Sequence, residues 1–198
     1  MAVVLGRNAP VPSNDALRIE IIPVEFVPHS PQWAEMAMVE GARLKSALGA
    51  NLLRVEHVGS TSIPGILAKP IVDLIPLVGD LDALDRARPE IEALGYDWLG
   101  EFGLPGRRYC RMNDPLTGKR KFQLHCYAVA SPEVARHVAF RDYLRAHPGI
   151  ARTYEREKQR AAALHPDDTM KYNDAKNDWI KRTEREALAW AAKPSSAP

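Results

Sequence analysis

The sequence predicts an α+β domain: a mixed sheet with helices mainly on one face and a helical segment at the C-terminal end. Three observations indicate this class. The expected elements follow the order helix, strand, strand, helix, strands and then helices, which is not a strict alternation of strands and helices. The apolar run 70–78 is interrupted by a single Asp73, as in a strand buried on both faces. Apolar and polar residues alternate over 121–129, as in a strand with one packed and one polar face.

The N-terminal half contains an extended segment, a helix, two strands and a second helix, expected over 19–27, 31–48, 52–58, 70–78 and 80–95. Ser30 and Pro31 supply an N-cap and a proline at the first helical position, and apolar residues then recur at helical spacing. Asp80 opens the second helix and Gly95 ends it.

The C-terminal half contains a short strand, two hairpin strands and three helical stretches, expected over 96–99, 107–112, 121–129, 131–146, 151–164 and 169–192. The polar turn 113–118 joins the two hairpin strands. His165 to Asp168, with a proline between them, breaks the helical pattern before the last helix.

The expected domain organisation is a flexible leader at 1–17, a single domain at 18–192 and a disordered tail at 193–198. Proline, glycine and small polar residues mark both ends of the chain. The 198 residues suffice for one domain with a sizeable core.

The composition limits the classes of partner. Lys and Arg total 27 against 25 Asp and Glu, so a net charge of +2 gives no reason to expect nucleic-acid binding. No apolar run is long enough to span a bilayer and no signal peptide is recognisable, so we expect a cytoplasmic protein without a membrane partner. Cys110 and Cys126 are expected to be two buried, reduced thiols; a disulfide or redox pair is the alternative.

A loop rich in glycine and hydroxyl groups follows the first strand. It contains Gly59, Ser60, Thr61 and Ser62. Glycine lets a backbone approach a ligand closely, and hydroxyl and N–H groups at a helix start bind phosphate. We expect a short helical turn near Ile63, and Lys69 before the next strand would add a positive charge. The sequence therefore indicates an anion site; the alternative is a loop that merely caps a helix.

Asp73 lies inside the apolar strand that follows this loop. A buried carboxylate costs several kcal/mol unless it is paired or bound to a metal. Asp73 is therefore expected to hold a divalent cation that bridges to the bound phosphates. A structural salt bridge to Lys69 or to an arginine is the alternative.

The segment from His57 to Asp73, HVGSTSIPGILAKPIVD, closely resembles the signature of the GrpB family. Further matches are Phe140 to Leu144, Tyr154 with Lys158, and Tyr172 with Lys176, and the resemblance covers roughly 21–191. GrpB proteins are similar to the polymerase-beta-like nucleotidyltransferases. The resemblance therefore implies a nucleotidyltransferase-like sheet. In that superfamily a Gly-Ser pair ends one strand, an acid-apolar-acid triplet lies on the next, and a later strand supplies a third acid.

The chain departs from that pattern at two of the three acids. The triplet is Asp73-Leu74-Ile75, so its second acid is missing, and the later strand offers Gln123 and His125. The resemblance implies Asp73 and His125 as catalytic residues, and Asp73, Gln123 and His125 as ligands of Mg²⁺. One metal or no metal at all are the alternatives to a two-metal centre. His125 as a surface histidine is the structural alternative.

The C-terminal helices add two lysines. Tyr154 and Lys158 are four residues apart, as are Tyr172 and Lys176, so each pair shares a helix face. Lys158 or Lys176 is expected to close over a triphosphate, with a tyrosine beside the base. Solvated faces with extended lysines are the alternative. His57 is expected either to orient the loop or to be a satisfied structural histidine.

Two functions follow from this reasoning. The first is binding of a nucleotide triphosphate or another phosphorylated small molecule, with transfer of a nucleotidyl group to an unknown acceptor. The second is a catalytically inactive accessory or chaperone-like module with a protein partner. The family resemblance links this module to coenzyme A synthesis, because GrpB domains occur joined to dephospho-CoA kinase. The sequence leaves open whether the chain is an enzyme.

Overall fold

The computed structural model describes residues 25–193. Its larger helices are α1 (Gln32–Leu48), α4 (Pro132–Ala146), α5 (Pro148–Leu164) and α6 (Thr169–Ala191), and two short helices are α2 (Leu81–Arg86) and α3 (Arg88–Ala93). Its strands are β1 (Leu52–Val58), β2 (Val72–Val78), β3 (Asp97–Trp98), β4 (Arg107–Asn113) and β5 (Arg120–Ala128). The expected leader at 1–17 and the expected tail, except Lys193, lie outside the described residues. The single domain expected at 18–192 stays a prediction.

The strands form one mixed sheet in the order β1-β2-β5-β4-β3. β2 pairs antiparallel with β1 and parallel with β5, and β4 pairs antiparallel with both β5 and β3. This order places Asp73 of β2 between Val58 of β1 and Gln123 of β5. The register therefore brings the end of β1 and the polar face of β5 to the same carboxylate.

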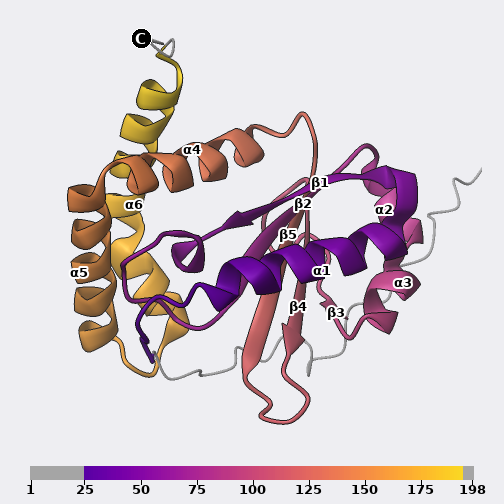
Figure 1. The fold of residues 1–198 in the computed structure, drawn as a ribbon, viewed down its shortest axis with the longest axis horizontal. Helices are drawn as coiled ribbons and strands as arrows, with labels where there is room; N and C mark the ends of the chain where they lie inside the picture. Colours follow the sequence, from indigo (N-terminus) through magenta and orange to yellow (C-terminus); the bar gives the residue numbers. More distant parts are fainter. Residues whose placement is uncertain (1–24, 194–198) are drawn as a thin grey trace, which may run out of the picture.

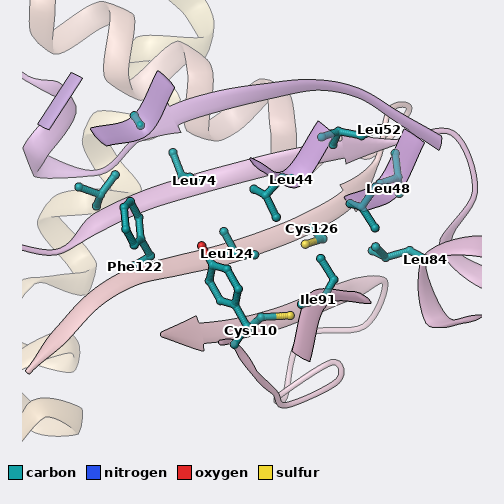
Figure 2. Packing of buried hydrophobic residues seen from close by; sticks show 14 of the residues in the cluster. Leu44, Leu48, Leu52, Leu74, Leu84, Ile91, Cys110, Phe122, Leu124 and Cys126 are labelled. Carbon is teal, nitrogen blue, oxygen red and sulfur yellow. The ribbon is translucent and has the colours of Figure 1, made fainter. Parts of the chain in front are cut away.

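Helices α1, α2 and α3 cover one face of the sheet (Figure 1). Apolar side chains of α1 recur every three or four residues and pack onto alternate residues of β2 and β5, such as Leu74 and Leu124. Figure 2 shows this cluster, to which Leu84 and Ile91 of the short helices also contribute. Cys110 is in the same cluster with Cys126, and both are buried free thiols, as expected.

The other face is partly covered by the C-terminal helices, with α4 running across the sheet and α5 and α6 beside it (Figure 1). Ile75, Leu77 and Tyr127 form a smaller core with Val134 of α4. A third cluster joins Ile63 of the loop after β1 to the three helices. The C-terminal helices therefore pack against that loop as well as against the sheet.

The α+β class, the mixed sheet and the C-terminal helical segment are confirmed. Two elements differ from expectation by more than a shift of a few residues at one end. The helix expected over 80–95 is two short helices, because Pro89 lies in the first turn of α3 and has no N–H for the ladder of a continuous helix. The strand expected over 96–99 is reduced to two residues. None of the helices within 25–193 is long and apolar enough to cross a bilayer.

Candidate anion-binding site

Gly59 and Asp73 lie against each other where β1 ends. Val58 is opposite Asp73 in the antiparallel register, and Gly59 follows with φ +71° and ψ −175°. This backbone conformation is essentially restricted to glycine. A Cβ at position 59 would lie 2.3 Å from Asp73 Oδ2. Glycine therefore allows the chain to leave β1 directly over the carboxylate.

The loop after Gly59 is held by its own hydroxyl groups. Ser60 to Ser62 form a single 3₁₀ turn, which begins before Ile63, where the sequence predicted a helical turn. Thr61 and Ser62 are buried: Thr61 Oγ1 lies 3.0 Å from His57 Nε2, and Ser62 Oγ donates to Gly59 O at 2.6 Å. These two predicted ligand residues therefore hold the turn, and no full helix begins at this loop.

A cavity of about 230 Å³ lies beside the turn. It is lined by Phe26, Gly59, Ser60, Lys69, Ile71, Asp73, Gln123, Tyr154, Lys158, Tyr172, Asn173 and Lys176. The lining combines the segments around β1 and β2 with β5, α5 and α6. The structure thus brings together all three lysines that the sequence singled out, with Gly59, Ser60, Asp73 and Gln123.

The lining is predominantly cationic, with three lysines against one carboxylate. Burial, together with the nearby ammonium of Lys176, lowers the pKa of Lys158 to about 7, although the Glu155 carboxylate opposes this shift. Burial lowers the pKa of Lys176 to about 8; Lys69 acts in the same direction and Asp73 opposes it. Burial also lowers the pKa of Lys69, again against the effect of Asp73. An anion in the cavity would favour the charged form of all three amines.

Two tyrosines form the walls next to these amines. Lys69 Nζ and Lys176 Nζ lie 4.5 and 4.1 Å from the centroid of the Tyr172 ring, and Lys158 Nζ lies 4.8 Å from that of Tyr154. Cations at these distances are attracted by the ring quadrupole. The aromatic faces therefore help to keep the lysines in place.

His125 lies next to Asp73 but outside the residues that line the cavity. Its Nε2 is 3.8 Å from Asp73 Oδ1, and Arg107 Nη1 is 3.4 Å from its Nδ1. Because a guanidinium can only donate, Nδ1 accepts, and in the neutral ring the proton is on Nε2, facing Asp73. Gln123, in contrast, contributes to the lining.

His57 contacts the turn but is not among the residues that line the cavity. Burial lowers its pKa to about 4, and the nearby arginines of α4, Arg141 and Arg145, act in the same direction, although Asp73 opposes them. A neutral His57 hydrogen-bonded to Thr61 fits the expected role of orienting the loop.

The predicted metal ligands provide a single carboxylate. Within residues 25–193 no group of three or more His, Cys, Asp or Glu side chains could hold a metal ion. Asp73, Gln123 and His125 therefore do not fit a two-metal centre, which requires several carboxylates to balance the charge. They fit at most one Mg²⁺ that is also held by phosphate oxygens and water.

A larger cavity of about 690 Å³ lies between α1, the end of α3 and the β4–β5 hairpin. Its most buried charged group, Glu40, is already paired, since it accepts from Arg43 Nη1 at 2.7 Å and from Tyr96 Oη at 2.9 Å. The three amines of the smaller cavity, in contrast, share a single carboxylate, Asp73, although Lys158 Nζ also donates to Leu67 O. We therefore place the candidate site at the smaller cavity.

Three lining residues were missed by the sequence reasoning: Phe26, Ile71 and Asn173. Phe26 reaches the site because Val27 pairs with Ala68 in an isolated antiparallel bridge. No local pattern indicates a bridge of that kind. Asn173 follows Tyr172 on α6, so its position next to the expected tyrosine was the only available signal.

The fold and the cavity define a class: an α+β protein with a lysine-rich cavity between its sheet and its C-terminal helices. The sequence model described as GrpB protein matches residues 23–186, and the chain therefore belongs to the GrpB family. The crystal structure of the conserved protein GrpB from Enterococcus faecalis superimposes with a TM-score of 0.79 at 42% identity, covering 85% of this chain and all of that one.

Two curated relatives are longer than this chain. The chain is 40% identical to UPF0157 protein YqkA of Bacillus subtilis (strain 168) over 84% of its own length and 48% of the relative. It is 29% identical to a protein of Mycobacterium leprae (strain TN) named dephospho-CoA kinase, over 85% of its length and 47% of the relative. The chain thus spans about half the length of both.

Proposed function

We propose that the cavity binds the phosphate groups of a phosphorylated small molecule, with a nucleotide triphosphate as the first candidate. One observation carries this proposal: three lysines from three segments converge on one cavity that contains a single carboxylate. Desolvating several like charges is unfavourable unless a counter-charge joins them. A phosphate chain supplies that counter-charge, and the small volume suits it better than a whole nucleotide.

The residues that line the cavity would have different roles in binding, according to their positions. Lys69 comes from the loop before β2 and Lys176 from α6, and both lie near enough to Asp73 for its charge to act on their pKa. Ser60 can donate a hydroxyl hydrogen bond. The rings of Tyr154 and Tyr172 are buried and face the lysines. A nucleoside would therefore extend out of the cavity rather than stack inside it.

Asp73 adds a way to hold one Mg²⁺ together with the phosphates. Mg²⁺ is commonly bound through one or two carboxylates plus substrate phosphates and water. When bound, the ion would neutralise charge on the phosphate chain. If Asp73 helps to hold Mg²⁺, Asp73→Asn should weaken ATP binding when Mg²⁺ is present. Without Mg²⁺ the same substitution should strengthen ATP binding, because it removes a negative charge from an anion site.

Nucleotidyl transfer is the activity that such binding would serve. Asp73 and the adjacent His125 are the proposed catalytic pair, with the Nε2 side of the imidazole facing the carboxylate. In this role the Asp73 carboxylate accepts the proton of an acceptor hydroxyl, and the Nε2–H of the neutral His125 ring faces that carboxylate. Release of pyrophosphate from ATP, followed with candidate acceptors, tests this activity separately from binding.

Isothermal titration calorimetry with ATP and with pyrophosphate, each with and without Mg²⁺, tests the binding proposal. Lys176→Met should weaken both ligands about tenfold or more, because it removes one ammonium from the cavity. Lys181→Met is the matched control, since it removes the same charge from an exposed position on α6. Equal affinities for the two variants, or no binding to the unmodified chain, would count against the site.

A second candidate is an accessory module in coenzyme A synthesis. The mycobacterial relative named dephospho-CoA kinase supports it, because this chain matches about half of that protein. Dephospho-CoA also carries phosphate groups of the kind that the cavity would take. Calorimetric titration with dephospho-CoA, and co-elution with the remaining part of the mycobacterial relative in size-exclusion chromatography, test this candidate; failure of both would remove it.

A further inference from the structure

Both backbone polar groups of Leu67 are bound by side chains of α5. The N–H of Leu67 donates to Glu155 Oε2 at 2.9 Å, and its C=O accepts from Lys158 Nζ. Glu155 and Lys158 are three residues apart and so lie on the same face of α5. One helix thus satisfies a donor and an acceptor of a loop residue that is 88 to 91 positions away in sequence.

The next residue, Ala68, is held by the segment before α1. Ala68 and Val27 exchange two backbone hydrogen bonds, of 2.9 and 3.0 Å, and Ala68 is fully buried. Lys69 follows immediately and enters the cavity. Its direction is therefore set by two consecutive residues, one fixed to α5 and the other to the segment before α1.

The two α5 side chains differ in their relation to the cavity. Lys158 is part of the lining, whereas Glu155 is not. We propose that Glu155 is a positioning residue for anion binding: by accepting the N–H of Leu67, it holds Lys69 at the distance and direction at which its ammonium meets the ligand. This inference rests on the proposed function of the cavity.

Direct charge repulsion between Glu155 and the ligand predicts the opposite effect. A carboxylate near an anion site repels the ligand, so its removal should leave binding unchanged or strengthen it. Positioning predicts weaker binding when the acceptor is lost, although the cavity keeps every lysine. Glu155→Gln separates the two explanations, because it removes the charge and retains an oxygen that accepts the Leu67 N–H. The same variant controls for the effect of the Glu155 charge on the protonation of Lys158.

The experiment is calorimetric titration of the full chain with pyrophosphate. We expect about tenfold weaker binding for Glu155→Ala, the order of loss for one hydrogen bond to a charged group, and affinity close to that of the unmodified chain for Glu155→Gln. Glu157→Ala should have no effect, because it removes a carboxylate of the same helix that pairs with Arg160 and is not among the residues that line the cavity. If Glu155→Ala fails to fold, Glu155→Asp takes its place, because it keeps the charge and shortens the reach.

Two results would overturn the inference: Glu155→Ala binding as tightly as the unmodified chain, or Glu155→Gln binding as weakly as Glu155→Ala. If the unmodified chain does not bind pyrophosphate, the proposed function fails, and amide hydrogen exchange then decides the positioning role without a ligand. Exchange over residues 63–71 should be faster in Glu155→Ala than in Glu155→Gln. Equal exchange in the two variants would refute the role of Glu155.

Discussion

Replacing Gly59 by alanine tests the contact on which the candidate site is built. At φ +71° and ψ −175°, a residue with a Cβ is strained by about 1–3 kcal/mol. The new Cβ would also lie 2.3 Å from Asp73 Oδ2 and 3.1 Å from Asp73 Cβ, so the carboxylate or the loop must move by about 1 Å. Such overpacking costs about 1–3 kcal/mol more.

The expected loss for Gly59→Ala is therefore about 2–6 kcal/mol of unfolding free energy. Urea denaturation followed by circular dichroism measures it. Gly65→Ala is the matched control: Gly65 has φ +77° in the same loop, but a Cβ there would meet nothing within 4 Å. It should carry only the backbone strain, about 1–2 kcal/mol.

A double variant separates the contact with Asp73 from the strain. In Gly59→Ala combined with Asp73→Ala, the carboxylate oxygen is gone, so the double variant should be more stable than the sum of the single losses by about 1 kcal/mol or more. The reasoning is refuted if Gly59→Ala costs no more than Gly65→Ala, or if the two losses at positions 59 and 73 simply add.

Three further predictions concern charge and buried polar groups. Sulfate, whose charge is constant near neutrality, should bind more weakly as the pH rises from 6 to 9, because Lys158 (pKa about 7) and Lys176 (pKa about 8) lose their protons. Calorimetric titration measures this affinity, and binding that does not change with pH would contradict the prediction. Burial lowers the pKa of His137 to about 3, so the unfolded state binds more protons than the folded state below the usual value of 6.5. The free energy of unfolding should therefore fall as the pH drops from 6.5 to 4. His137→Phe should show a smaller fall in urea denaturation, and an unchanged fall would argue against this origin. Tyr127 Oη is buried without a hydrogen-bond partner among the described residues, so Tyr127→Phe should be neutral or slightly stabilising. Tyr96→Phe, in contrast, should cost about 1–3 kcal/mol of unfolding free energy, because it removes a hydrogen bond from the buried carboxylate of Glu40. Equal urea midpoints for the two variants would refute the contrast.

The strands and most helices could be predicted because their periodicities are local. The hairpin alternation placed Phe122 and Leu124 in the core and Gln123 on the opposite face, and the structure has them there. The split at Pro89 was visible in the sequence, but the apolar stripe on both sides of it favoured one helix. There the missing proline N–H outweighed the hydrophobic periodicity.

The candidate site was less predictable, since direction within a loop depends on packing. Thr61 and Ser62 have the same chemistry as Ser60, yet the 3₁₀ turn directs them inward, where His57 and Gly59 O bind them. His125 shares a sheet face with Gln123 but lies two residues further along β5, beyond the cavity lining. Sequence alternation assigns a face of the sheet and not a distance from a cavity.

The arginines of α4 show how the helices shape the site without entering it. Arg141 Nη1 donates to His57 O, and Arg145 Nε donates to Ser62 O at 2.8 Å, on either side of the turn. Arg141 also pairs with Asp142 and with Glu56 of β1, so its guanidinium joins α4 to the last residues of that strand. Together with the α5 contacts to Leu67, these bonds hold backbone groups along the whole segment that leads from β1 to Lys69. An anion site built from lysines needs such restraint, because flexible ammonium groups that repel one another converge on a ligand only if their backbone is fixed beforehand.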